Sequence, residues 1–163
     1  MLRCKWCNMH NKKYIEYHDN EWCRKNFNDK YLFEMLILES FQAGLSWECV
    51  LNKREAFRKA YDNFEIDKIC KYDNEKIQEL LQNDIQKEYG TFYKYLTTFT
   101  KEKTLYETNK TTNSLSDNIS RDLQKRGMKF VGSTIIYSYL QAIGVIYSHD
   151  KDCFMYKDEN IYF

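Results

Sequence analysis

The run KYLFEMLILESFQAGLSW, residues 30–47, constrains the fold of this chain more than any other stretch. The spacing of one α-helical face is followed by Leu32, Leu36, Glu39 and Ala43. Apolar residues fill most of the positions between them, so the helix would be hydrophobic nearly all round. A helix of that kind is covered on all sides by other elements. We therefore expect this run to form a central, buried helix.

Glu39 is the acidic residue that this pattern places where water is scarce. A buried carboxylate is costly, so it is neutralised, hydrogen-bonded or kept for a ligand. Gly44 should end the helix, and Ser46 should cap a new helix that begins at Trp47. A large aromatic ring and a buried acid would then flank one turn. Two interpretations stay open here: a core acid bonded to the backbone, or a functional carboxyl group.

The composition favours a helical protein of a single domain, residues 1–163. There is no proline and there are only 5 glycines, which predicts long helices joined by short polar connections. The net charge of +1 indicates neither an acidic nor a basic partner, although a local basic stripe could still bind nucleic acid. No apolar run is long enough to span a bilayer, and the N-terminus MLRCKWC lacks the apolar core of a signal peptide. We therefore expect a cytoplasmic protein.

Further helices are expected along the rest of the chain. The segment 47–61 should form one helix whose buried positions are Val50, Leu51, Ala56, Phe57 and Ala60. Shorter helices are expected at 64–72, 74–82 and 91–99, followed by an exposed loop at 101–117. Ser116 or Asp117 should cap a helix over 118–126 that Gly127 closes in the left-handed conformation. A second strongly apolar helix should run from 133 to 143 and end at Gly144.

Cysteine and histidine residues gather at the two ends of the chain. In a reducing compartment, six cysteines favour metal binding or free thiols over disulfides. His149 and Cys153 are four residues apart, so one helical turn or a tight loop could bring both to one point. With Cys4 and His18 they would form a closed Cys₂His₂ set, typical of structural zinc, that staples the tail to the N-terminal segment. Two alternatives stay open: a C-x-x-C pair of Cys4 with Cys7, or scattered residues without a common role.

Three segments resemble the 3-methyladenine DNA glycosylase I family: YIEYHDNEW (14–22), LFEMLILESFQAGLSWECVLNKREAFRKAYDNF (32–64) and KRGMKFVGSTIIYSYLQAIG (125–144). Together with Arg3-Cys4-x-Trp6 and His149-x-x-x-Cys153 they cover more than a third of the chain in matching order. The motifs HDNEW, QAGLSW and KRG-x-KFVG are too specific for ordinary helical sequence. The resemblance implies an all-α fold of the helix-hairpin-helix DNA glycosylase kind, with a zinc-binding subdomain formed by residues 1–27 and 145–163. It also implies excision of 3-methyladenine from alkylated double-stranded DNA.

The same resemblance implies roles for individual residues. Glu39 would be the catalytic-site carboxylate that hydrogen-bonds the flipped base, and Trp47 the ring that stacks on it. The other aromatic residues in or near the pocket would be Tyr17, Tyr14, Trp6 and Trp22, with core packing an equal alternative for all but Tyr17. Leu45 would insert into the duplex. The resemblance assigns a structural zinc ion to Cys4, His18, His149 and Cys153, which decides against Cys7.

One part of the family pattern is missing. After residue 83 the family continues through an arginine-rich hairpin and a further long helix, whereas residues 84–89 take the place of all of that here. The missing part would hold the second half of the helix-hairpin-helix, whose amides and basic side chains grip phosphate. The candidates for the remaining DNA contacts are Lys125, Arg126 and Lys129, around Gly127.

These observations support three functions to different degrees. The first is a monofunctional, monomeric DNA-3-methyladenine glycosylase of base excision repair, since the motif places no lysine for lyase chemistry. The second is an impaired or degenerate relative that keeps a zinc-stapled fold and a purine pocket without effective DNA binding. A zinc hydrolase is disfavoured, because four protein ligands leave no open coordination position. Release of 3-methyladenine from methylated DNA distinguishes the first two.

Overall fold

The helix at the centre of the molecule is α2 (Asp29–Phe41). The computed structural model describes residues 1–42, 45–69, 85 and 87–157. Every residue of α2 from 32 to 40 is buried, which confirms the expected central helix. Asn28 caps it by accepting a hydrogen bond from the backbone N–H of Tyr31. The helix ends at Phe41, earlier than expected, and Gly44 lies outside the described residues.

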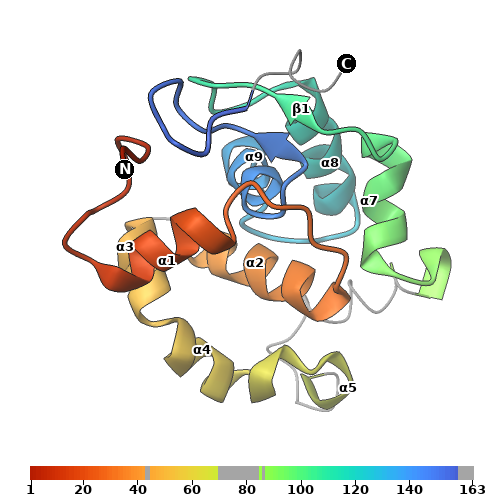
Figure 1. Cartoon of the computed structure of the whole chain (residues 1–163). Coiled ribbons are helices and arrows are strands. Elements are labelled where there is room, and N and C mark those ends of the chain that lie inside the picture. The colour runs from red at the N-terminus through yellow and green to blue at the C-terminus, as the bar shows by residue number, and fades with distance from the viewer. Residues whose placement is uncertain (43–44, 70–84, 86, 158–163) are drawn as a thin grey trace.

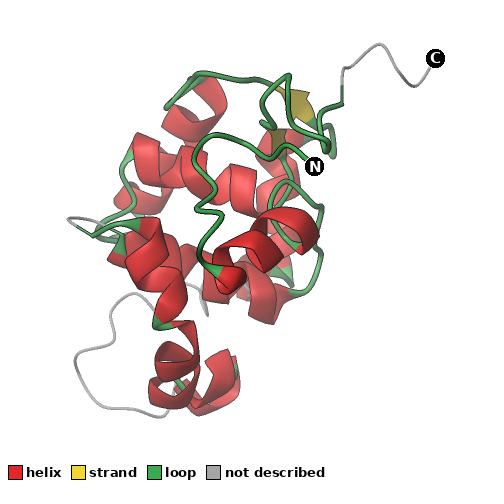
Figure 2. Cartoon of the chain, turned by 60° about the vertical axis from the view of Figure 1, so that its left-hand side comes forward, coloured by secondary structure: helices red, strands yellow, loops and turns green. Residues whose placement is uncertain are grey.

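Shorter helices surround α2 and a second buried helix, α9 (Ser133–Ala142). In Figure 1, α1 (Lys12–Asn20) and α3 (Trp47–Asn52) lie to the left of α9, and α7 (Phe92–Thr100) and α8 (Ser114–Lys125) lie to its right. At the lower end, α4 (Arg54–Ala60) is followed by the 3-10 helix η1 (Asp62–Phe64) and by α5 (Ile66–Ile69). Figure 2 shows helices over most of the described chain, as the all-α expectation requires.

Two short strands tie the tail to the segment before α8. β1 (Leu105–Tyr106) pairs in parallel with β2 (Ile146–Tyr147), with Leu105 opposite Ile146. The expectation of an exposed loop over 101–117 was therefore wrong for residues 105–106. The two strands are far apart in the sequence, and a pairing over such a distance leaves no local pattern to read.

The single helix expected over 47–61 is two helices, because the chain turns at Lys53 between α3 and α4. Ser46 caps α3 as expected, by accepting from the N–H of Cys49. Of the expected buried positions Val50 and Leu51 are buried and Phe57 is half-buried, whereas those predicted at Ala56 and Ala60 are exposed. The turn at Lys53 rotates the face of α4 and buries Arg54 instead.

Arg54 is buried because it meets two carboxylates. Its guanidinium donates to Glu34 at 2.8 Å and to Glu21 at 2.8 and 2.9 Å. Arg58 donates to the same Glu34 oxygen at 2.7 Å. Burial alone would raise the pKa of Glu34, but the hydrogen bonds from Arg54 and Arg58 outweigh it and lower that pKa. This network joins α1, α2 and α4.

The helices on the C-terminal side follow most of the expected limits. The helix expected at 91–99 is α7, and the segment 74–82 lies outside the described residues. α8 begins at Ser114, earlier than expected, because Asn113 and Ser116 form a capping box there. Gly127 has a φ of 93°, the left-handed conformation expected of it. A Cβ atom at Gly144 would lie 2.2 Å from the backbone of Arg24, so this position needs glycine. Within the described part of the chain, no helix is long and apolar enough to cross a membrane.

Candidate functional site

Glu39 lies inside the molecule with its carboxyl group incompletely bonded. The residue is 3 % exposed, and its Oε2 atom has no hydrogen-bond partner in the structure. Burial raises the pKa of Glu39 to about 8, so the carboxyl group is neutral at pH 7. Buried polar atoms that serve only the fold are nearly always bonded. Of the two interpretations, a carboxyl group kept for a ligand therefore fits the geometry better.

The ring of Tyr17 lies close to this acid, and the ring of Trp47 packs on Tyr17. Tyr17 of α1 is 2 % exposed and packs on Trp47 of α3, with ring centroids 5.3 Å apart and planes at 56°. The pKa of the Tyr17 phenol is raised well above its usual value, first by burial and then by the charge of Glu39, which lies close by. The Nε1 atom of Trp47 is buried and has no hydrogen-bond partner in the structure. Helices α1, α2 and α3 thus each bring one expected site residue to the same place.

The three other expected aromatic residues form a chain of rings that ends at the imidazole of His149. Trp6 packs edge-on against Tyr14 at 5.2 Å and against Trp22 at 4.7 Å, and its Nε1 atom is also unpartnered. Trp6 also lies 6.4 Å from Tyr17, measured between ring centroids. Trp22 is 4.6 Å from the imidazole of His149. Trp22 therefore packs on the histidine cluster. Trp6 lies between Trp22 and Tyr17 and so connects this cluster with the rings near Glu39.

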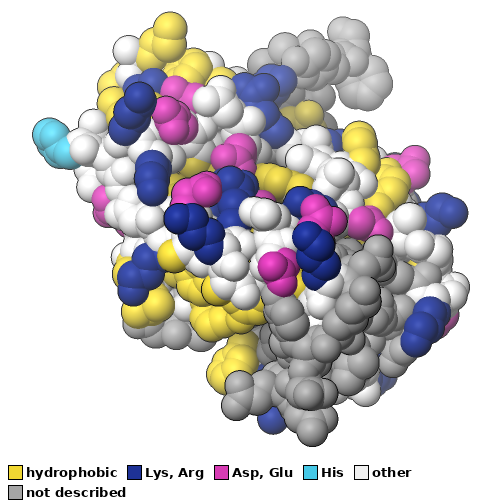
Figure 3. Space-filling model, turned by 90° about the horizontal axis from the view of Figure 1, so that it is seen from below, with side chains coloured by type: hydrophobic (Ala, Val, Ile, Leu, Met, Phe, Trp, Pro, Cys, Tyr) yellow, Lys and Arg dark blue, Asp and Glu magenta, His cyan; other side chains and the backbone are white. Residues whose placement is uncertain are grey.

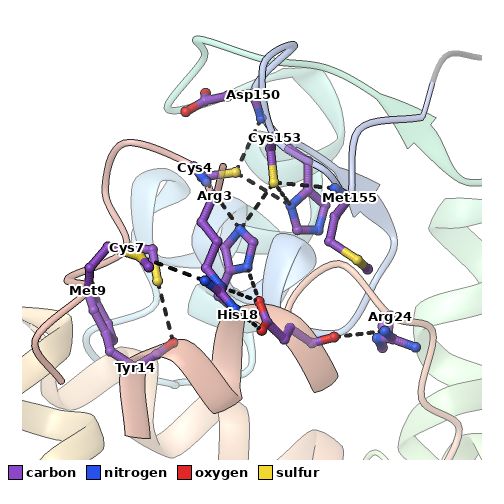
Figure 4. A network of polar contacts seen from close by, with 12 residues as sticks. Arg3, Cys4, Cys7, Met9, Tyr14, His18, Arg24, Asp150, Cys153 and Met155 are labelled. Atoms are coloured by element: carbon purple, nitrogen blue, oxygen red, sulfur yellow. Dashed lines mark hydrogen bonds and ion pairs between the residues drawn. The ribbon is translucent and has the colours of Figure 1, made fainter. Parts of the chain in front are cut away.

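The four cysteine and histidine residues of the two chain ends meet in one buried cluster (Figure 4). Their ligand atoms all lie within 4.8 Å of one another. The Cys4 sulfur is 3.4 Å from Nδ1 of His149, and the Cys153 sulfur is 3.4 Å from Nε2 of His18. Burial lowers the pKa of His149 to about 4 and so favours the neutral imidazole, the form that binds metals. These four residues could hold a metal ion.

Backbone amides support both sulfur atoms. The N–H of Asp150 donates to the Cys4 sulfur at 3.2 Å, and that of Met155 donates to the Cys153 sulfur at 3.4 Å. Cys7 lies outside the cluster: its sulfur donates to the Tyr14 carbonyl at 3.8 Å, so the C-x-x-C alternative does not fit this geometry. His18 Nδ1 lies 2.8 Å from the Asp19 carboxylate, a partner that was not expected from the sequence. An acid directly after a candidate histidine ligand was the available signal.

Leu45 lies on the surface at the turn between α2 and α3. Its side chain is 50 % exposed, and its N–H donates to the carbonyl of Gln42 at 2.9 Å. Leu45 is therefore an exposed apolar residue two positions before Trp47, and its insertion into a duplex stays a prediction. Residues 43 and 44 of the same turn lie outside the described residues.

The basic residues around Gly127 differ in how they are held. Lys125 and Lys129 have exposed side chains. Arg126 is half-buried and donates to Asp122 at 2.8 Å and to Glu88 at 2.7 Å. Arg126 also donates to the Tyr89 hydroxyl at 3.2 Å, so its guanidinium is already engaged within the protein. The expectation that Arg126 contacts DNA therefore requires these bonds to break first.

α8 and α9 are packed together and joined by residues 126–132, so one helix–link–helix unit is present. Of the segment 84–89, where the family hairpin was expected to be missing, residues 84 and 86 lie outside the described residues. Figure 3 views the molecule from the side of α4 and α5. On the described part of that face, basic and acidic side chains are interspersed and neither forms a patch of its own.

The family described as methyladenine glycosylase matches residues 6–85 and 82–156, and the chain belongs to that family. It is 37 % identical to DNA-3-methyladenine glycosylase 1 of Escherichia coli (strain K12), over 96 % of this chain and 97 % of that protein. It is 32 % identical to DNA-3-methyladenine glycosylase of Haemophilus influenzae (strain ATCC 51907 / DSM 11121 / KW20 / Rd), over 93 % and 96 %.

Solved structures agree with this assignment. The structure that describes 3-methyladenine recognition by 3-methyladenine DNA glycosylase I from Staphylococcus aureus superposes with a TM-score of 0.86. The two chains are 28 % identical over 97 % of this chain and 98 % of the other. The expected family and fold are confirmed.

This chain is shorter than the matched part of the Escherichia coli protein. The alignment runs over 184 positions, which exceeds the 163 residues of this chain by 21. At least that many residues of the relative therefore have no counterpart here. The two matched family segments overlap at residues 82–85, next to the segment 84–89 where the missing hairpin is expected.

Proposed function

We propose that this chain is a monofunctional DNA-3-methyladenine glycosylase that acts as a monomer in base excision repair. The observation that carries this proposal is Glu39: a buried carboxyl group, unpartnered at Oε2, beside the paired rings of Tyr17 and Trp47. Family membership and relatives named for 3-methyladenine support the choice of substrate.

The chemistry of the substrate fits these residues. An enzyme that acts on a base takes it out of the stack and holds it by stacking and by hydrogen bonds to its edge. A 3-methylated adenine in DNA is cationic, and both an aromatic face and a carboxylate attract a cation. The cation would lower the pKa of Glu39 and favour its ionised form, so one residue would supply both a hydrogen bond and charge complementarity. Trp47 would stack on the base.

The reaction needs little from the protein beyond this recognition. The bond from the sugar C1′ to N9 of the base breaks, and its electron pair neutralises the cationic base as it leaves. Water adds its oxygen to C1′ and releases a proton. Because the methylated base is already a good leaving group, modest stabilisation of the developing sugar cation is sufficient.

We propose that the Cys₂His₂ cluster holds structural zinc. At the usual zinc bond lengths, tetrahedral geometry places sulfur and nitrogen ligands roughly 3.3–3.8 Å apart. The distances of 3.4, 3.4 and 3.6 Å between sulfur and imidazole atoms fit that range. Four protein ligands leave no position for a water molecule, so the ion would stabilise the joined chain ends and take no part in catalysis.

Incubation with methylated duplex DNA tests the enzymatic function directly. We expect release of 3-methyladenine by the wild type, measured by chromatography of the free base. The variant that tests the candidate acid in this assay is Glu39→Gln. Its control is Glu16→Gln, a change at an exposed residue of α1. Wild-type protein that folds, binds the free base and releases none from DNA would support the degenerate relative instead.

Trp47→Ala should weaken binding of free 3-methyladenine. Stacking of a base on an aromatic ring is worth about 1–3 kcal/mol, so we expect an affinity about 5- to 150-fold lower. Titration calorimetry measures it. Trp22→Phe is the matched control, because Trp22 packs on His149 at the far end of the aromatic chain. Equal affinities of wild type and Trp47→Ala would place the base elsewhere.

Duplex binding should be weak and only slightly dependent on salt. Each phosphate contact contributes about −0.9 to the slope of log affinity against log salt. Lys125 and Lys129 are exposed, and Arg126 would have to leave Glu88 and Asp122 to reach phosphate, so we count two phosphate contacts near Gly127. A slope of about −2 is then expected from this link.

Fluorescence anisotropy with a duplex at several salt concentrations measures that slope. The Escherichia coli relative, which has at least 21 more residues in the alignment, is the reference. Lys125→Met and Lys129→Met should each flatten the slope by about 0.9. A steep slope that neither change affects would show that another surface binds the DNA.

A further inference from the structure

We propose that Asp19, held by Arg3, is a positioning residue of the metal centre that fixes the His18 imidazole for binding through Nε2. This inference rests on the proposed metal binding by Cys4, His18, His149 and Cys153. It assigns a role to two residues that are not themselves ligands.

The hydrogen bonds around His18 define which ring nitrogen carries the lone pair. The backbone N–H of Cys4 donates to Nε2 at 3.3 Å, so Nε2 is the acceptor. The other nitrogen, Nδ1, then carries the hydrogen and donates to Oδ1 of Asp19 at 2.8 Å. Nε2 also lies 3.4 Å from the Cys153 sulfur, inside the cluster. Asp19 thus selects the tautomer and the ring orientation that a metal ligand requires.

Asp19 is in turn held by two hydrogen bonds from one side chain. The Arg3 guanidinium donates from Nε to Oδ1 at 2.8 Å and from Nη2 to Oδ2 at 2.6 Å. The side chains of Arg3 and Asp19 are 17 % and 22 % exposed, so this two-pronged contact is largely shielded from water. A carboxylate held in this way cannot rotate away from His18 without breaking both bonds.

The Arg3–Asp19 pair also connects all three ligand-bearing segments. Arg3 precedes the ligand Cys4, and Asp19 follows the ligand His18. The Arg3 guanidinium lies 5.5 Å from the ring centre of Phe154, which follows the ligand Cys153. The pair that orients His18 therefore also lies next to Cys4 and, through the ring of Phe154, close to Cys153.

His149 shows that this support is specific to one histidine. Its Nδ1 faces the sulfurs of Cys4 and Cys153, and its Nε2 has no hydrogen-bond partner in the structure. The two imidazoles are therefore presented through opposite nitrogens, and only the His18 ring has a carboxylate behind it among the residues described. Of the two histidines, only His18 should therefore respond directly to a change at Asp19.

The test measures zinc loss from the intact chain. Zinc-loaded wild type, Asp19→Asn and Arg3→Met are mixed with a chromophoric chelator, and the rate of zinc transfer is followed. Replacing a group that orients a metal ligand typically costs about 10- to 100-fold in metal affinity. We expect zinc transfer to be faster by a similar factor in both variants.

Asp122→Asn is the matched control. Asp122 accepts from Arg126 at 2.8 Å with a similar side-chain exposure of 32 %, but it lies on α8 away from the cluster. It should release zinc at the wild-type rate. The visible spectrum of the cobalt-substituted protein provides a second readout, because a changed His18 geometry alters the ligand-field bands of Asp19→Asn and leaves those of Asp122→Asn unchanged.

Three outcomes would overturn the inference. Wild-type rates in both variants would show that the pair does not support the metal, although the metal proposal itself would stand. Equal acceleration by Asp122→Asn would show a general loss of stability rather than a role at His18. A wild type that binds no zinc would overturn the metal proposal and this inference together.

Discussion

Glu39→Gln should stabilise the folded protein at alkaline pH and weaken its binding of 3-methyladenine. The pKa of Glu39 is about 8 in the folded chain, against 4.5 for an ordinary glutamate. Between these two values the folded state holds a proton that the unfolded state has lost. The free energy of unfolding of the wild type therefore falls as the pH rises through this window. Glutamine has no proton to lose, so the free energy of unfolding of the variant should not fall in this window.

The expected size follows from the same linkage. One pKa unit corresponds to about 1.36 kcal/mol, so the full difference approaches about 4–5 kcal/mol above pH 8. Urea unfolding of wild type and Glu39→Gln at pH 5 and pH 9 measures it, and the two proteins should differ several times more at pH 9 than at pH 5. Binding of free 3-methyladenine should be several-fold weaker in the variant, because a group able to ionise beside the base is gone.

Glu16→Gln is the control for both halves of this prediction, since Glu16 is an exposed residue of α1 paired only with Lys12 among the contacts described. It should follow the wild type at both pH values. If Glu39→Gln also follows the wild type in its pH dependence and in its affinity, Glu39 is a structural acid and the site proposed here is wrong.

Removal of the metal should lower the thermal stability by the second largest amount, because the ion would join the two ends of the chain. Structural zinc contributes about 10–16 kcal/mol of binding free energy in zinc-finger peptides, and part of such an energy should appear here as stability. Cys153→Ser replaces a sulfur ligand with a poor one. A loss of a few kcal/mol would lower Tm by roughly 10 °C, because a chain of this size loses about 2–4 °C per kcal/mol.

Elemental analysis and thermal unfolding, with and without a chelator, measure this effect. Cys7→Ser is the matched control: Cys7 is also a buried cysteine of the N-terminal segment, but it lies outside the cluster. Hydrogen exchange should locate the loosening of Cys153→Ser in residues 1–11 and 145–157, with α2 and α9 still protected. Full zinc content in Cys153→Ser, or none in the wild type, would contradict the assignment.

Much of the candidate site was open to prediction because it depends on local patterns. The buried position of Glu39 follows from its place on a helix that is apolar all round. The Ser46 cap and the left-handed Gly127 follow from rules that act within a few residues. The choice of Cys4 over Cys7 did not follow from spacing alone; it needed the family resemblance, and the cluster geometry agrees with it.

Other features depend on contacts between residues far apart in the sequence. Arg54 is buried only because α4 turns toward Glu34 and Glu21, which no periodicity within 47–61 reveals. Arg126 looks like a phosphate contact in the sequence, yet Glu88 and Asp122 already bind it. A charge pattern indicates which residues could form ion pairs, but it does not indicate which oppositely charged side chains come into contact.

The amino-acid sequence by itself determined the central helix, several helix caps and the candidates for the site residues, because hydrophobic period, capping chemistry and motif are properties of neighbouring residues. Only the tertiary structure decided that Glu39 is neutral and unpartnered at one oxygen, and that Asp19 supports His18 and not His149. Desolvation and hydrogen-bond direction depend on everything packed around a group, and that surrounding exists only once distant segments have come together.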